Sequence, residues 1–237
     1  MRISKYGNLY QLTLLPRLFP VNCYVYEEEN ELTLIDAGMP ASFKGIVQLV
    51  ERIKKPLTNI ILTHAHGDHV GSLDQLKQHF PNVAVSISQR DSRLLAGDLT
   101  LDAEEPNTPI KGGFDKNLKT IPDRLLNEGD RIGSFEVIST PGHTPGSISL
   151  FNTTNRQLIV GDAMQTKGKV AVVGQLVPTF PFPTFGTWNK ELALYSVKKI
   201  YELQPSLVAV GHGKVLEYPK DLVKQAIQDA EKKLVNV

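Results

Sequence analysis

Hydrophobic residues in the first half of the chain occur in two spacings, and each spacing predicts a different element. Apolar residues that alternate or form short runs predict strands at 9–15, 22–27, 31–36, 59–62 and 83–88. Apolar residues at helical spacing predict helices over 42–54, from Val70 to the residue before Pro81, and more briefly over 89–97. The first half therefore begins with strands and continues with alternating helices and strands.

The second half repeats this order after a segment, 98–123, whose Pro, Gly and Asp residues predict a long loop. Loops of this length in compact domains are often functional. The later predictions are strands at 131–140, 147–151, 157–161 and 206–210, an irregular stretch at 168–187, and helices over 188–203 and 219–234. Two halves of this kind predict two sheets packed together with helices outside, in a single domain spanning 1–237.

Charge and cysteine content narrow the possible partners and location. With 26 basic and 25 acidic residues, the formal net charge is +1, which does not indicate a nucleic-acid-binding or membrane-binding surface. The single cysteine, Cys23, excludes an intramolecular disulfide and fits a reducing compartment. The N-terminal stretch lacks the apolar core of a secretory signal, and no run of about 18 apolar residues could span a bilayer. We therefore expect a soluble, cytoplasmic protein, with no indication of its oligomeric state.

The stretch THAHGDH at 63–69 contains three of the six histidines and one carboxylate. Residues two apart on an extended segment point the same way, so His64 and His66 can bind one ion together. Asp68 and His69 are adjacent and project differently, so they can reach a second ion nearby. Gly67 is expected to let the backbone turn tightly between the two pairs. The motif therefore suits two metal ions side by side.

Two further histidines and one aspartate lie between small residues at the ends of predicted strands. They are His143 in TPGHTPGS, Asp162 in IVGDAM and His212 in VGHGK. Zinc prefers four ligands, so we expect His143 to join the HxH pair on one ion and His212 to join the DH pair on the other. A carboxylate at a buried strand end needs a partner. Asp162 would have two if it bridged both ions.

Each part of this set has a simpler explanation when it is taken alone. A lone HxH motif is common, an isolated Asp162 could be a turn residue, and structural zinc sites are usually rich in cysteine. The combination of five histidines and two aspartates is what favours a metal centre. The sixth histidine, His79, lies on a predicted helix beside Phe80 without a partner motif. It is expected to be a structural or surface residue.

These residues resemble those of the metallo-β-lactamase superfamily. THAHGDH is similar to the superfamily's HxHxDH signature, and His143, Asp162 and His212 match its later single histidine, bridging aspartate and last histidine, in that order. The match covers the chain from about Gly7 to Gly213. It implies an α+β fold, a four-layer αββα sandwich, with the metal ions at one edge of the sheets.

The resemblance also bears on the branch of the superfamily. True β-lactamases generally lack an aspartate matching Asp162 and are exported, so the chain looks closer to the glyoxalase II, lactonase and small-hydrolase branches. The segments LFPVNCYVYEEENELTLIDAGMP and TPGHTPGSISL are similar to those of small bacterial probable metallo-hydrolases. Quorum-quenching lactonases carry a tyrosine where this chain has Gln165, which makes a lactonase the weaker match. Asp36 in LTLIDAG matches an early strand-end aspartate and is expected to support a metal ligand from behind.

For function, the resemblance implies a metal-dependent hydrolase of a small-molecule substrate. Two divalent ions, expected to be zinc with manganese or iron as alternatives, would share a bridging hydroxide that attacks a thioester, lactone or simple ester. Asp68 is the expected catalytic residue, because it would orient the hydroxide and could take up its proton. Loops at 98–120 and 165–188 would shape the pocket. The aromatic residues of the second loop would form an apolar lid or pack as ordinary core: Phe180, Phe182, Phe185 and Trp188.

Other functions share this ligand set. A mononuclear-iron oxidoreductase of the persulfide dioxygenase type is one alternative, and a phosphodiesterase is another. Flavodiiron members of the superfamily also need a flavin domain, and nuclease members usually carry an added RNA-binding domain or a longer chain. A non-catalytic metal-binding module is the third alternative, but all seven expected ligands are present.

Overall fold

The computed structural model describes residues 1–235 and divides the chain into two compact units. Unit 1 comprises Met1–Gly97 and Phe114–Leu126, and unit 2 comprises Asp98–Gly113 and the chain from Asn127 onward. The predicted long loop therefore contributes residues to both units. The expectation of a single domain stays a prediction. Within residues 1–235, no helix is both long and apolar enough to cross a lipid bilayer.

Unit 1 is built on one seven-stranded sheet whose strands lie side by side in chain order. They are β1 (Arg2–Tyr6), β2 (Leu9–Leu14), β3 (Val21–Glu27), β4 (Leu32–Ile35), β5 (Leu57–Ile61), β6 (Ala84–Ser88) and β7 (Arg124–Leu126). The pairs from β1 to β4 are antiparallel and those from β4 to β7 are parallel. Parallel neighbours need crossover connections, and these contain η1 (Pro40–Ser42), α1 (Phe43–Ile53), α2 (Gly67–Val70), α3 (Leu73–His79) and α4 (Gln89–Leu95).

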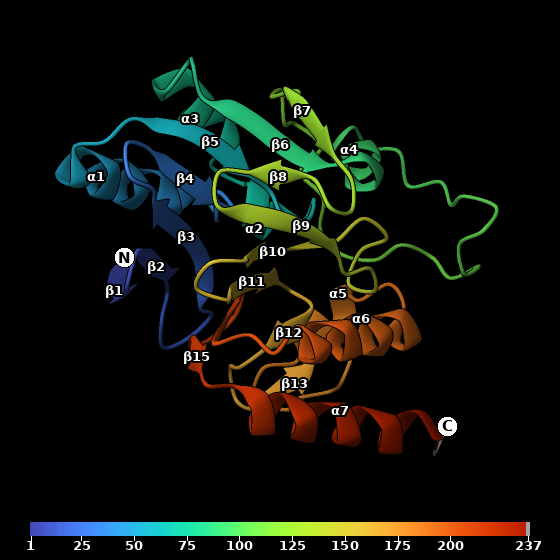
Figure 1. Ribbon diagram of the computed structural model, residues 1–237. Coiled ribbons are helices and arrows are strands. Elements are labelled where there is room, and N and C mark those ends of the chain that lie inside the picture. The colour runs from blue at the N-terminus through green and yellow to red at the C-terminus, as the bar shows by residue number, and fades with distance from the viewer. Residues whose placement is uncertain (236–237) are drawn as a thin grey trace. The chain divides into compact units, whose positions relative to one another are not determined.

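The burial of unit 1 follows the apolar spacing of the sequence. β4 is buried at all four positions, as expected of a strand with a neighbour on each side. α1 buries Ile46, Val47 and Val50 on one side and packs beside α3, as Figure 1 shows. It ends where Lys54 adopts a left-handed backbone with a φ of 63°, just before Pro56.

Unit 2 contains a six-stranded sheet in the order β15-β14-β11-β10-β9-β8 and a two-stranded sheet, β12-β13. The strands are β8 (Arg131–Ile132), β9 (Phe135–Ser139), β10 (Ile148–Asn152), β11 (Gln157–Gly161), β12 (Met164–Gln165), β13 (Ala171–Val172), β14 (Leu207–Val210) and β15 (Leu216–Glu217). The helices are α5 (Phe182–Gly186), α6 (Lys190–Glu202) and α7 (Lys220–Val235). α6 and α7 pack on each other and on β13, over a core that includes Val197, Val208 and Val210.

Strand pairing places the predicted ligands of each unit at the same end of the strands of its sheet. In unit 1, Ile35 of β4 is paired with Ile61 of β5, so the segments that follow both strands emerge together. In unit 2, Gly161 of β11 is paired with Val210 of β14 in the same parallel sense. The turn that holds His143 joins β9 to β10, and because β10 runs antiparallel to β11, this turn lies at the same edge.

Several predictions of local structure were wrong in detail. The helix expected from Val70 begins at Leu73, as α3, and Val70 is instead the last residue of the short helix α2. The backbone N–H of Gly71 donates to the carbonyl of Gly38 (2.8 Å), so α2 does not continue into α3. The strand expected at 131–140 is split into β8 and β9 at Gly133, which has a φ of 53°. The stretch expected to be irregular, 168–187, contains β13 and α5.

The long loop predicted at 98–123 is confirmed. It contains neither a helix nor a strand, and its one element of pairing is an isolated bridge at Phe114.

Gly142→Ala should destabilise unit 2 strongly. Gly142 has a φ of 136°, and a Cβ there would lie 2.3 Å from the backbone nitrogen of Ala193 on α6. Strain and overlap together should lower the free energy of unfolding by about 3 kcal/mol or more. Gly129→Ala is the matched control, because Gly129 has a φ of 82° with no atom near a Cβ, so only about 1–2 kcal/mol of strain is expected. Urea unfolding of both variants measures the difference, and equal losses would contradict it.

Candidate metal centre

The HxHxDH motif is separated from the end of β5 by two residues, and its His66, which has an extended backbone, directly precedes α2. The backbone turns between the two pairs, as expected, because the N–H of His69 donates to the carbonyl of His66 (2.9 Å); Gly67 begins α2 and needs no positive φ for this turn. The glycine that the local packing requires is Gly71, because a Cβ at that position would lie 2.7 Å from Cδ of Pro40. The short helix α2 carries Asp68 and His69 and brings the ring of His69 next to that of His64.

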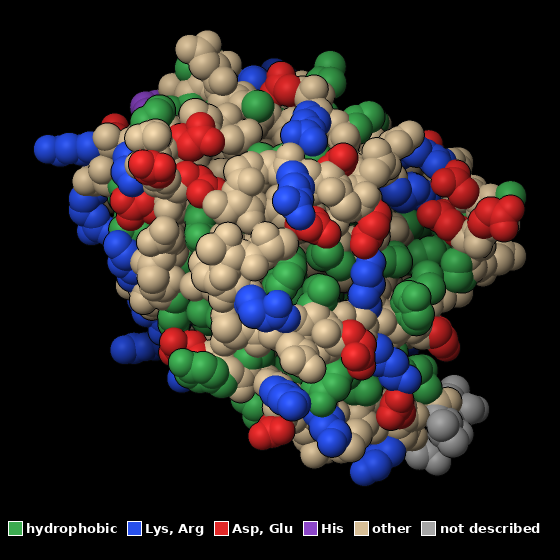
Figure 2. Space-filling model, in the orientation of Figure 1, with side chains coloured by type: hydrophobic (Ala, Val, Ile, Leu, Met, Phe, Trp, Pro, Cys, Tyr) green, Lys and Arg blue, Asp and Glu red, His purple; other side chains and the backbone are tan. Residues whose placement is uncertain are grey.

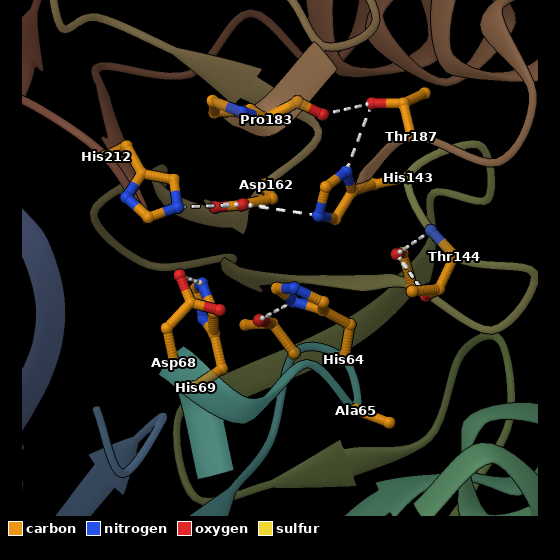
Figure 3. Close-up of polar contacts among 12 residues, drawn as sticks. His64, Ala65, Asp68, His69, His143, Thr144, Asp162, Pro183, Thr187 and His212 are labelled. Carbon is orange, nitrogen blue, oxygen red and sulfur yellow. Dashed lines mark hydrogen bonds and ion pairs between the residues drawn. The ribbon is translucent and has the colours of Figure 1, made fainter. Parts of the chain in front are cut away.

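The four ligands predicted in unit 1 lie together: Figure 3 shows His64, Asp68 and His69 side by side, and the ring of His66 contacts that of His64. The ring centroids of His64 and His66 are 4.9 Å apart, and those of His64 and His69 are 4.1 Å apart. The three imidazoles are buried, whereas the Asp68 side chain is 27% exposed. A carboxylate oxygen of Asp68 lies 4.0 Å from Nε2 of His69, so these two groups could contact one ion. Unit 1 therefore offers three nitrogen donors and one oxygen donor in one place.

Asp36 and Thr63 fix the protons of two of these histidines. The Asp36 carboxylate accepts hydrogen bonds from the Thr63 backbone N–H (2.7 Å) and from the Thr63 hydroxyl (2.8 Å), and it lies 2.8 Å from Nδ1 of His69. Because a carboxylate only accepts, Nδ1 of His69 must carry a proton. The Thr63 hydroxyl already donates its hydrogen bond to Asp36. Toward Nδ1 of His64, at 3.1 Å, it can therefore only accept. Both histidines therefore present an Nε2 lone pair.

Two contacts in unit 1 were not anticipated from the sequence. The buried Asp91 of α4 accepts a hydrogen bond from the backbone N–H of Ala65 (3.0 Å) and so holds the loop between the first two histidines. The ring of Phe114 lies 5.0 Å from the ring of His66, and the backbones of these two residues form an isolated bridge. Asp91 is 26 residues from Ala65 and Phe114 is farther still from His66, so no local pattern could have identified either contact.

The three ligands predicted in unit 2 also lie together (Figure 3). One oxygen of Asp162, Oδ2, is 3.3 Å from Nε2 of His143 and 3.1 Å from Nε2 of His212. All three side chains are buried. Two imidazole nitrogens thus approach the same carboxylate oxygen, which is the position expected of a group that bridges two ions.

Thr187 sets the expected position of the proton on His143 in unit 2. Its hydroxyl donates to the carbonyl of Pro183 (2.7 Å), so toward Nδ1 of His143, at 3.3 Å, it can only accept. Nδ1 of His143 then carries the proton, and a neutral imidazole would present only a lone pair at Nε2. That lone pair faces Oδ2 of Asp162. Two acceptors this close need either a proton or a metal ion between them.

The donor set therefore fits a divalent metal ion. In His64, His69 and His143, the nitrogen that remains for a ligand is Nε2, and an oxygen holds the other nitrogen, which is the arrangement typical of metal-binding histidines. Imidazole and carboxylate donors suit zinc, manganese and iron. Cys23 does not contribute, because it is fully buried and burial raises the pKa of its thiol far above the usual range. It therefore stays a neutral, unreactive thiol.

The aromatic segment of unit 2 divides into two kinds of residue. Phe180 and Trp188 are buried and pack as core, whereas Phe182 and Phe185 are 53% and 66% exposed. Gln165 is buried, and its Nε2 donates to the carbonyl of Phe180 (3.3 Å), so it supports this segment. His79 is exposed and contacts the rings of its neighbours, as expected of a surface residue.

Comparison with known proteins agrees with these features. The family model described as the metallo-beta-lactamase superfamily matches residues 16–212. The uncharacterized protein YobT of Bacillus subtilis is 57% identical over 98% of this chain and 100% of its own length. The probable metallo-hydrolase YflN of the same organism is 32% identical over 78% of this chain and 76% of its own. Hydroxyacylglutathione hydrolase GloC of Haemophilus influenzae is 32% identical over 62% of this chain and 68% of its own.

Solved structures also resemble this chain in fold. TTHA1623 in a di-iron-bound form covers 89% of this chain and 96% of its own, with a TM-score of 0.65 and 26% identity. The chain belongs to the metallo-β-lactamase superfamily, and its relatives include probable metallo-hydrolases and a hydroxyacylglutathione hydrolase. The predicted fold class, α+β with the fold of this superfamily, is thereby confirmed.

Removing the carboxylate of Asp36 should weaken metal binding and stability together. Asp36→Ala leaves the buried Nδ1–H of His69 and the backbone N–H of Thr63 without their acceptor, which should cost about 3 kcal/mol or more of unfolding free energy. Metal affinity should fall about 10- to 100-fold, because the ring of His69 loses its orientation. Asp36→Asn retains one acceptor oxygen, so its losses of unfolding free energy and of metal affinity should both be smaller. Chelator competition measures the affinity, and unchanged metal binding in Asp36→Ala would contradict this role.

Proposed function

We propose that this protein is a two-metal hydrolase that cleaves an ester-type bond in a small molecule. The observation that carries the proposal is the approach of two buried imidazole nitrogens, Nε2 of His143 and Nε2 of His212, to the same oxygen of the buried Asp162. The proposed ligands are His64, His66 and His143 for one ion, Asp68, His69 and His212 for the other, and Asp162 as the bridge. When bound, two such ions lower the pKa of a water toward neutrality and polarise a carbonyl group.

The chain's own residues supply the rest of the chemistry. Asp68 is the most accessible of the proposed ligands, and its carboxylate can orient a water and accept a proton at Oδ2. Asp36 holds the Nδ1 proton of His69 directly and that of His64 through the Thr63 hydroxyl. Both protons therefore stay on the side away from the proposed ions. Thr187 does the same for His143. These contacts keep the imidazoles in the tautomer that binds metal.

The relatives support a thioester ahead of the other ester-type bonds. A hydroxyacylglutathione is a thioester, and GloC, the relative that bears this name, is 32% identical to the chain. A lactone or a simple ester contains the same kind of electrophilic carbonyl and stays within the proposal. We propose zinc as the metal, because it suits these nitrogen and oxygen donors and needs no redox chemistry for hydrolysis. The di-iron form of TTHA1623 makes iron the principal alternative.

Metal content and hydrolysis should be measured first and on the same preparation. Elemental analysis should give two divalent ions per chain. A panel of thioesters, lactones, aryl esters, a phosphodiester and a cephalosporin should show turnover on one of the ester classes. One iron per chain without hydrolysis would instead identify an oxidoreductase of the persulfide dioxygenase type, and turnover of the phosphodiester alone would identify a phosphodiesterase.

Replacing Asp162 should remove the shared ligand. Asp162→Ala is expected to lose both ions and to reduce kcat/KM by at least about a thousandfold, because the water nucleophile depends on the ions. Asp229→Ala is the matched control, since Asp229 also lies in unit 2 but pairs with Lys169 on the surface. It should retain metal and activity. Full retention of two ions and of activity in Asp162→Ala would exclude the bridging role.

A further inference from the structure

α5 presents two phenylalanine rings to solvent in a part of unit 2 that is otherwise well packed. Phe182 and Phe185 are 53% and 66% exposed, while Phe180 and Trp188 on either side are buried. Hydrophobic side chains reach the surface on the face that Figure 2 shows, where α5 and α6 lie in Figure 1. Exposed single apolar residues are ordinary. Two exposed rings on one short helix are less ordinary, and the contacts of that helix show where the rings lie.

The segment that contains α5 contacts two of the proposed metal ligands. The ring of Phe182 lies 5.4 Å from that of Phe180, and the ring of Phe180 lies 5.4 Å from that of His212. At the other end of the segment, the Thr187 hydroxyl lies 3.3 Å from Nδ1 of His143. The exposed ring of Phe182 is therefore separated from His212 by the single ring of Phe180, and Phe185 lies three residues farther along the same short helix.

Hydrogen bonds hold the segment in place, so the rings are not exposed through disorder. Gln165 donates to the carbonyl of Phe180 (3.3 Å), and the Thr184 hydroxyl donates to the carbonyl of Gln175 (2.6 Å). The Trp188 ring N–H donates to the carbonyl of Thr108 (2.8 Å) in the predicted long loop. α5 is thus a fixed platform, and a ligand that covered it would pay little for ordering it.

We propose that Phe182 and Phe185 bind the apolar acyl group of the substrate, so that the protein prefers medium-chain acyl esters or thioesters to acetyl ones. The proposal rests on the proposed hydrolase function and adds a substrate class to it. An acyl chain lies directly next to the carbonyl that reacts, and the rings lie close to the residues proposed to bind the ions. Each buried CH₂ can contribute up to about fourfold in kcat/KM, and less on rings that stay partly in water.

A chain-length series tests the preference. For p-nitrophenyl acetate, butyrate and octanoate, kcat/KM of the native protein should rise about twofold or more per CH₂. Phe182→Ala/Phe185→Ala should flatten the series by lowering the octanoate value at least tenfold while the acetate value changes less than twofold. Tyr195→Ala is the matched control, because Tyr195 is a 67% exposed aromatic residue on α6. It should leave the series unchanged.

A binding measurement separates this proposal from the hydrolase proposal. Ligand-observed NMR on the metal-loaded protein should show octanoate binding at least tenfold more tightly than acetate, with the difference lost in the double variant and kept in Tyr195→Ala. Equal binding of octanoate by native and double-variant protein would overturn the acyl site, even if esters are hydrolysed. Phenylalanine-dependent octanoate binding without hydrolysis of any ester would keep the acyl site and overturn the hydrolase.

Discussion

The position of the proton on each imidazole is the constraint on which the proposed centre depends. A histidine can bind a metal through Nε2 only if its proton stays on Nδ1, and neutral imidazole has no strong preference of its own. In this protein, oxygen acceptors decide the matter: the Asp36 carboxylate for His69, the Thr63 hydroxyl for His64 and the Thr187 hydroxyl for His143. Each hydroxyl is itself committed to a stronger acceptor, so the direction of every hydrogen bond is fixed.

Two of these acceptors, Asp36 and Thr63, follow the ends of β4 and β5, whereas Thr187 follows α5, and the backbone at the site is strained in places. Asp36 has a φ of 59°, an uncommon conformation for a residue with a side chain, and it follows directly after β4. Gly142 has a φ of 136° beside the backbone of α6, which positions the turn that contains His143. Parallel pairing explains the common location in each unit, because the carboxyl ends of neighbouring parallel strands meet at one edge.

The surroundings of the ligands differ between the two units. In unit 1, polar groups from the segments that follow β4, β5 and β6 hold the motif loop: Asp36, Thr63, and Asp91 on α4. In unit 2, an aromatic segment lies next to the ligands, and only part of it is buried. A polar framework suits the task of fixing donor atoms, whereas partly exposed phenylalanine rings suit the recognition of an apolar group. This difference is the physical basis for assigning the acyl group to α5.

The sequence by itself determined which residues are proposed as ligands, and it determined the elements with strong periodicity. The HxHxDH spacing, the histidines and aspartate at strand ends, and the apolar patterns of α1, β4 and β14 are local signals, and local geometry is sufficient to interpret them. The tertiary structure decided the rest. β1 and β7 are edge strands with exposed residues, so their stability comes from pairing with β2 and β6 and not from an apolar pattern. The roles of Asp91, Thr187 and Phe114 depend on partners distant in sequence, such as the 44 residues between His143 and Thr187, and only folding brings such pairs into contact.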